Sequence, residues 1–140
     1  MQITYTRKGD VHTIDAGEGA LAPIVVDYTP FEPKLRSGTA KKLLGAAAVF
    51  CYCEALTGSL EARGVKYENL KATADLTVGG NDLGQGRVKE ITLTITLDVS
   101  ESDAETFARV EKIMKQGCLI TGSLHDGIKM NYDLQPNFKA

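Results

Sequence analysis

The segment from Thr39 to about Arg63 constrains the fold of this chain more than any other. It is dominated by Ala, Leu, Lys and Glu, with Thr39 suited to the N-cap and Gly64 to the stop, which predicts a helix. Between Leu43 and Phe50 this helix is apolar on nearly all sides, so most of its surface has to be buried. The rest of the chain must therefore supply structure around it.

Strand patterns lie on both sides of the expected helix. Three segments within residues 1–29 predict three strands, because they either alternate apolar and polar residues or are rich in β-branched residues. They are MQITYTRKG, DVHTIDAG and APIVVDYT. Residues 65–78 and 86–99 predict two more strands joined by the glycine-rich GGNDLGQG. In EITLTITLDV the aliphatic residues fall on one face and the threonines on the other. In the C-terminal segment GIKMNYDLQP, apolar and polar residues alternate again, which predicts a last strand.

A second helix is expected between the last two strands. The sequence from Ser102 to Glu105 matches a capping box, and the helix should end near Gly117 with Cys118 at or just past its last turn. The resulting order, β-β-β-α-β-β-α-β, predicts an α+β fold with antiparallel hairpins, in a single domain covering residues 1–140.

Composition narrows the class of protein. The chain has 140 residues, 43% of them hydrophobic and 24% charged, with a net charge of −2, which is ordinary for a globular domain. Its Lys and Arg residues are scattered, so no nucleic-acid partner is expected. The N-terminus lacks an apolar signal core and the apolar run 43–53 is too short for a bilayer, so no membrane partner is expected. Three cysteines without an export signal predict reduced thiols and a cytoplasmic location.

The cysteines are the candidate reactive groups. Successive helical residues turn by about 100°, so Cys51 and Cys53 point roughly 200° apart and cannot bind one metal or each other. Their spacing is also not that of zinc ligands, and we expect neither a metal nor another cofactor. Cys51 shares a stripe with small residues, and Cys118 would be its partner if the two helices pack together. Two buried structural thiols remain the alternative on spacing alone.

The cysteine-bearing segments resemble those of the OsmC/Ohr family of osmotically inducible and organic-hydroperoxide-resistance proteins. GTAKKLLGAAAVFCYCEAL is similar to the central-helix motif of that family, and KQGCLITGSL to its second cysteine motif. The matching positions are Leu44, Gly45, Ala46, Ala47 and Cys51, then Cys118, Ile120 and Leu124. The resemblance implies an intertwined homodimer with curved antiparallel sheets around two buried helices and active sites at the subunit interface.

The resemblance also implies a chemistry. Cys51 would be the peroxidatic thiol that attacks an organic hydroperoxide and becomes a sulfenic acid. Cys118 would be the resolving thiol that condenses with it to a disulfide, and a dithiol reductant would reopen that bond. Cys53 has no counterpart in the family motif and is interpreted as a packing residue, with an alternative reactive thiol left open.

Some positions depart from the family pattern. Catalytic members carry a glutamate near the start of the central helix, where this chain has Lys41 and Lys42. An upstream arginine normally pairs with that glutamate beside the thiolate, and Arg36 is the nearby candidate here. Glu54 lies one turn after Cys51 and is the candidate acid for a rebuilt pair with Arg36. A solvent-facing or purely structural Glu54 remains the alternative.

Two functions follow as hypotheses. The first is a thiol peroxidase that reduces organic hydroperoxides through Cys51 and Cys118, with Arg36 holding the thiolate. The second is a divergent, non-catalytic OsmC-like protein that binds an apolar small molecule at the dimer interface. A purely structural dimer is a third possibility that leaves the cysteine pair unexplained.

Overall fold

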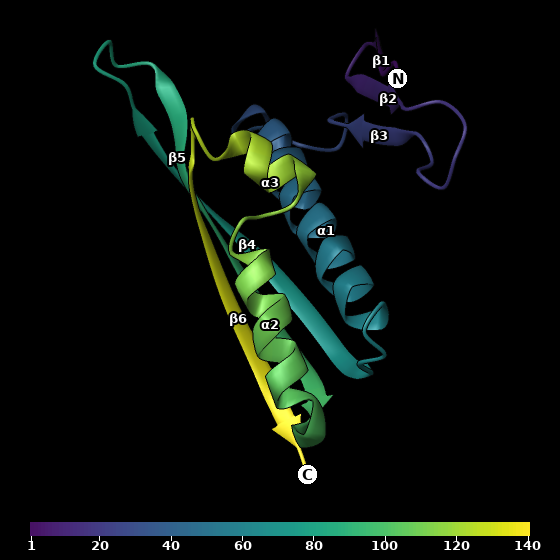
Figure 1. Ribbon diagram of the computed structural model, residues 1–140. Helices are drawn as coiled ribbons and strands as arrows, with labels where there is room; N and C mark the ends of the chain where they lie inside the picture. Colours follow the sequence, from purple (N-terminus) through teal and green to yellow (C-terminus); the bar gives the residue numbers. More distant parts are fainter. The chain divides into compact units, whose positions relative to one another are not determined.

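The computed structural model describes all 140 residues and divides into two compact units, residues 1–39 and residues 40–140. The first unit is a three-stranded antiparallel sheet in the order β1-β2-β3 (Figure 1). Its elements are β1 (Thr4–Lys8), β2 (Val11–Asp15), β3 (Ile24–Asp27) and the 3₁₀ turn η1 (Pro33–Leu35). The three N-terminal strands predicted from alternation are therefore present.

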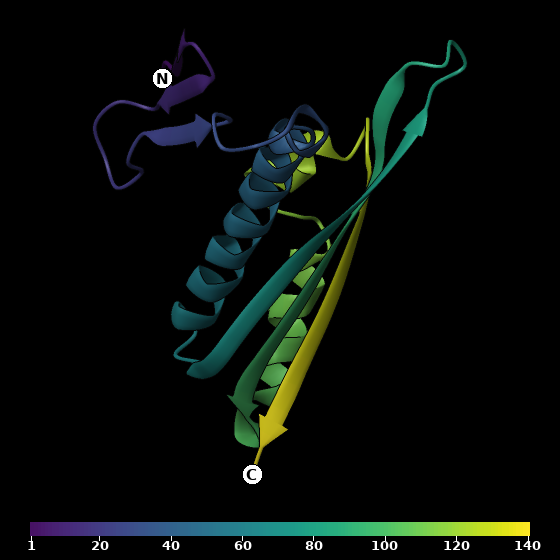
Figure 2. The same ribbon diagram turned by 180° about the vertical axis from the view of Figure 1, so that it is seen from behind.

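The second unit combines helices with a long three-stranded sheet in the order β4-β5-β6. Its elements, in chain order, are α1 (Thr39–Glu61), β4 (Tyr67–Gly80), β5 (Gly86–Ser100), η2 (Glu101–Asp103), α2 (Ala104–Met114), α3 (Leu119–Leu124) and β6 (Lys129–Lys139). In both views of the ribbon, α1 and α2 run along one face of this sheet and α3 lies beside the first half of α1 (Figures 1 and 2). The α+β class expected from the sequence is confirmed.

One strand pair differs from the antiparallel expectation. β4 and β5 form an antiparallel hairpin, whereas β5 and β6 are parallel. The reason is that α2 and α3 lie between β5 and β6 and carry the chain back to the starting end of β5, as a parallel pair requires. β6 is an edge strand, which explains why it tolerates Pro136.

The core lies between α1, α2 and the central strand β5. The alternating aliphatic residues of β5 are at most 2% exposed. They pack with a buried stripe of α1, comprising Gly45, Ala48, Tyr52, Leu56 and Leu60, and with Phe107, Val110 and Met114 of α2. A Cβ added at Gly45 would lie 2.9 Å from Cδ1 of Leu76 on β4, so glycine lets α1 approach the sheet closely.

The opposite face of α1 is not covered by the rest of the second unit, residues 40–140. Ala46, Ala47 and Phe50 are exposed, although the apolar pattern predicts burial on most sides. By length and composition alone, the helical segment Pro33–Glu61 is apolar enough to cross a membrane, contrary to the expectation from the shorter run 43–53. Core helices of globular proteins meet the same test, and α1 packs one face against the sheet.

The second helical region departs from the sequence prediction. The expected capping box from Ser102 to Glu105 is wrong: these residues straddle η2 and α2, and Ser100 provides the side-chain cap for η2. α2 also ends at Met114 rather than near Gly117, and a short helix, α3, follows. Cys118 is the N-cap of α3 and does not belong to the last turn of α2.

Candidate active site: a cysteine pair between α1 and α3

The structure brings Cys51 and Cys118 together, although they are far apart in the sequence. Both are partly exposed free thiols, and they lie close enough for each to influence the pKa of the other. Cys51 is on α1 beside the buried stripe, and the backbone N–H groups of Leu119 and Ile120 at the start of α3 act to lower the pKa of its thiol. The structure therefore places Cys51 next to the segment that carries Cys118.

Thr121 fixes the position of Cys118. The backbone N–H of Cys118 donates to Thr121 Oγ1 at 2.9 Å, and the backbone N–H of Thr121 lies 3.5 Å from Cys118 Sγ. The two side chains also meet directly, with Oγ1 and Sγ 3.4 Å apart. Thr121 is completely buried, so this reciprocal cap is held by the surrounding core.

The electrostatics of the two thiols differ. Burial is the main cause that raises the pKa of Cys51, and its hydrogen bond to Cys118 raises it further. For Cys118, burial is also the largest influence and acts upward. The hydrogen bonds that its sulfur accepts from Cys51 and from Thr121 outweigh burial, so the net pKa of Cys118 is lowered. The same contact between the two thiols therefore acts in opposite directions on their pKa values.

Aromatic residues line the wall behind Cys118. The rings of Tyr52 on α1 and Tyr132 on β6 are stacked, with centroids 4.8 Å apart and planes 8° from parallel. A Cβ added to Gly117 would lie 2.6 Å from both Tyr132 Oη and Thr121 Oγ1. Burial, followed by the nearby Tyr132, raises the pKa of Tyr52, which stays neutral at physiological pH. The thiols therefore lie against a packed, neutral wall.

Cys53 differs from the other two cysteines. It is partly buried against the core, and burial is the main cause that raises its pKa, followed by the charges of Glu54 and Cys118. A raised pKa lowers the thiolate fraction at neutral pH and makes the thiol less reactive. This environment is consistent with the interpretation of Cys53 as a packing residue.

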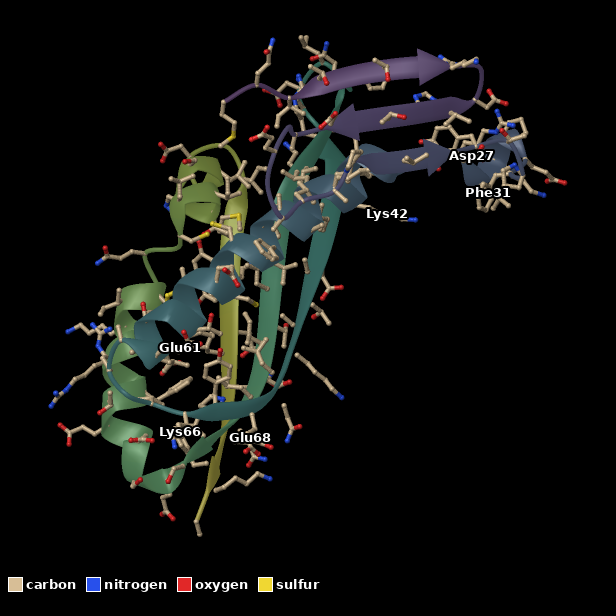
Figure 3. The ribbon with its side chains drawn as sticks, turned by 90° about the vertical axis from the view of Figure 1, so that its right-hand side faces the viewer. Asp27, Phe31, Lys42, Glu61, Lys66 and Glu68 are labelled. Carbon is tan, nitrogen blue, oxygen red and sulfur yellow. The ribbon has the colours of Figure 1, made fainter.

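The charged candidates lie in different surroundings. The interactions of Arg36 lie within residues 1–39: its Nη1 is 3.2 Å from a carboxylate oxygen of Asp10, and its Nε donates to the carbonyl of Phe31 at 2.8 Å. Glu54 is exposed on α1, and Lys42 points away from that helix into solvent (Figure 3). The catalytic roles predicted for Arg36 and Glu54 therefore remain predictions.

Sequence reasoning missed the supporting residues of the pair. Thr121 belongs to a Cys-x-x-Thr spacing directly after Gly117, which is the pattern of a helix start. That signal was not used because the prediction placed Cys118 at or just past the end of the preceding helix and expected no further helix there. No group of three His, Cys, Asp or Glu side chains is arranged to hold a metal ion.

Comparison with known proteins places this geometry in a family. Residues 37–133 match the family model described as OsmC-like protein. The chain is 28% identical to Peroxiredoxin OsmC of Escherichia coli (strain K12), over 95% of this chain and 99% of that protein. An OsmC-like protein from Mycoplasma pneumoniae superposes with a TM-score of 0.73 at 16% identity, covering 97% of this chain and 96% of the other. The organic hydroperoxide resistance protein OhrB of Bacillus subtilis gives 0.61 at 14% identity, covering 96% and 98%.

Proposed function

The chain belongs to the OsmC family, and from this we propose that it reduces organic hydroperoxides with Cys51 and Cys118 as its reactive thiols. The observation that carries the proposal is the proximity of these two thiols, one on α1 and one at the start of α3, where each influences the pKa of the other. Its likeness to Peroxiredoxin OsmC and to the fold of OhrB supports hydroperoxide detoxification. Such an activity belongs to antioxidant defence, and we propose a cytoplasmic location for it.

The proposed reaction uses both thiols once per turnover. Cys51 attacks the terminal oxygen of ROOH, the O–O bond breaks, and the products are an alcohol and Cys51 sulfenic acid. Cys118 then attacks the oxidised sulfur, water leaves, and a Cys51–Cys118 disulfide forms. A dithiol reductant restores the two thiols. The sum is ROOH plus two thiols giving ROH, water and one disulfide.

We further propose that the active protein is a homodimer. The exposed apolar face of α1, formed by Ala46, Ala47 and Phe50, is the kind of surface that a second subunit covers. A covered site would exclude water and favour an apolar peroxide over a polar one. We propose that Arg36 is the cation that holds the Cys51 thiolate, because burial and the neighbouring Cys118 raise the pKa of that thiol and a positive charge would oppose them.

The test is a peroxide reaction followed at each cysteine. Reduced protein is mixed with cumene hydroperoxide or with hydrogen peroxide, and mass spectrometry maps the disulfides with time. We expect a Cys51–Cys118 disulfide that forms faster with the organic peroxide. Cys51→Ser should abolish peroxide consumption, Cys118→Ser should trap the sulfenic acid, and Arg36→Met should slow the first step.

Cys53→Ser is the matched control, because it changes a thiol on the same helix that the reaction does not use. Loss of activity in that variant would contradict the assignment of the pair. Inertness of the wild-type thiols toward both peroxides would favour the non-catalytic alternative, a protein that binds an apolar small molecule at the dimer interface. One observation favours that alternative: the first turn of α1 has no acidic residue.

A further inference from the structure

We propose that a pocket beside the segment carrying Cys118 binds a small organic carboxylate, at a site separate from the cysteine pair. The pocket lies between the end of α2, the helix α3 and the start of β6, and its volume is about 230 Å³. It is lined by Lys115, Gln116, Gly122, His125, Met130 and Tyr132. This inference goes beyond the proposed function and does not depend on it, because binding requires no reaction of either thiol.

The size of the pocket limits its ligand to a small molecule. Sites for drug-sized ligands usually have volumes of about 300–1,000 Å³, whereas a cavity of about 150 Å³ is enough for benzene. A pocket of about 230 Å³ therefore suits a ligand slightly larger than benzene, namely a ring or short chain that carries one polar group.

The polar side chains of the pocket present donors that no acceptor of the chain occupies. The side chains of Lys115, His125 and Tyr132 take part in no hydrogen bond or salt bridge within the chain. Lys115 carries a positive charge, a histidine ring has an N–H donor whether it is neutral or charged, and the tyrosine hydroxyl can donate as well. An anion is the ligand that satisfies such a set.

Tyr132 is the fixed donor among them. Its ring stacks on that of Tyr52, with centroids 4.8 Å apart and planes 8° from parallel. Its hydroxyl lies against Gly117, because a Cβ added to that glycine would meet Tyr132 Oη at 2.6 Å. The hydroxyl is therefore held at the wall of the pocket, whereas the exposed Lys115 at the end of α2 is free to turn toward a ligand.

Two further features favour an organic carboxylate. Met130 is only 9% exposed and gives the pocket an apolar floor, where the carbon part of a ligand would be removed from water. The carboxylates nearest in the sequence, Glu111 and Asp126, do not line the pocket, so no negative side chain opposes an anion there.

The pocket adjoins the backbone that carries Cys118 without including its sulfur. Gly122 lines the pocket, and its backbone N–H donates to the Cys118 carbonyl at 2.8 Å. A ligand bound in the pocket would therefore change the surroundings of the Gly122 amide, which serves as a reporter of binding.

The experiment is a titration of the reduced protein with benzoate, without peroxide, followed by two-dimensional ¹H–¹⁵N NMR. We expect the Gly122 amide signal to shift in a saturable way, with a Kd of about 1 mM. Benzamide has the same shape without the charge, and it should bind at least about tenfold more weakly.

Three variants test the residues that recognise the carboxylate. Lys115→Met removes the charge at nearly the same length and should weaken benzoate binding by at least about tenfold. Tyr132→Phe keeps the ring that stacks on Tyr52, removes the hydroxyl, and should weaken binding by about fivefold. Lys112→Met is the matched control and should leave binding unchanged, because Lys112 is exposed in the last turn of α2 but does not line the pocket.

Several outcomes would overturn the proposal. They are the absence of a saturable shift with benzoate, equal binding of benzamide, and wild-type binding by Lys115→Met. Inorganic phosphate that binds as tightly as benzoate would overturn the assignment to a carboxylate. Benzoate binding by a protein whose thiols are inert toward peroxides would support this site and refute only the proposed function.

Discussion

At the residue scale, the surroundings of each cysteine determine the pKa of its thiol. Three cysteines lie within the same unit, but hydrogen bonds lower the pKa of Cys118 while burial raises the pKa of Cys51 and Cys53. The surroundings of each cysteine therefore shift its pKa in a different way, although all three lie within one unit.

Gly117 offers a residue-scale prediction of stability. Its φ of +79° disfavours any side chain, and a Cβ there would clash with Thr121 and Tyr132 at 2.6 Å. We expect Gly117→Ala to lower the free energy of unfolding by about 2–5 kcal/mol, combining backbone strain with overpacking. Equilibrium unfolding in urea measures the change.

Gly84→Ala is the control for that substitution. Gly84 has a similar φ of +74°, but nothing lies within 4 Å of an added Cβ. Only the strain remains, so the expected loss is about 1–2 kcal/mol. Equal losses for the two variants would show that Gly117 is not packed against the cysteine site as described.

At the element scale, two glycines of α1 differ in how closely other residues pack against them. A Cβ added at Gly45 would lie only 2.9 Å from Cδ1 of Leu76 on β4, whereas a Cβ added at Gly58 would meet nothing within 4 Å. Replacing a helical glycine by alanine stabilises the helix by about 0.8–1 kcal/mol. We expect Gly58→Ala to gain that amount and Gly45→Ala to gain less or to destabilise, because Leu76 must move.

The measurement is the unfolding midpoint of the two variants under the same conditions. The pair is matched because both substitutions have the same helix propensity and lie on the same helix. Equal stabilisation by both would contradict the close packing of α1 against β4. A loss at Gly58 instead would indicate that this face of α1 is covered by another subunit.

At the scale of the whole molecule, the exposed apolar face of α1 gives a test of the proposed homodimer. Phe50 on that face is 69% exposed. If a second copy covers it, Phe50→Asp should weaken dimerisation by at least about tenfold, because it replaces a buried aromatic ring by a charge. Analytical ultracentrifugation over a concentration series gives the dissociation constant.

Leu83→Asp serves as the comparison, since Leu83 is 81% exposed but lies in the loop between β4 and β5. Its substitution should leave the oligomeric state unchanged if the face of α1 is the interface. A wild-type protein that remains monomeric at all concentrations would refute the dimer. So would a Phe50→Asp variant that dimerises as well as the wild type.

The sequence alone determined the elements whose pattern is local. Alternation in β5 and in the N-terminal strands, and the composition of α1, predicted strands and a helix that the structure contains. The α+β class followed from their order, and the OsmC-like cysteine motifs indicated the family. These features can be read from the sequence because the period of apolar side chains and helix propensity depend on a few neighbouring residues.

Only the tertiary structure decided the features that depend on contacts between distant residues. The parallel pairing of β5 and β6, the separate helix α3 and the cap of Cys118 by Thr121 were not predicted. Neither was the opposite direction of the pKa shifts at Cys51 and Cys118. The physical reason is that strand direction follows from the path of the crossover, and ionisation follows from burial and hydrogen bonds that packing creates.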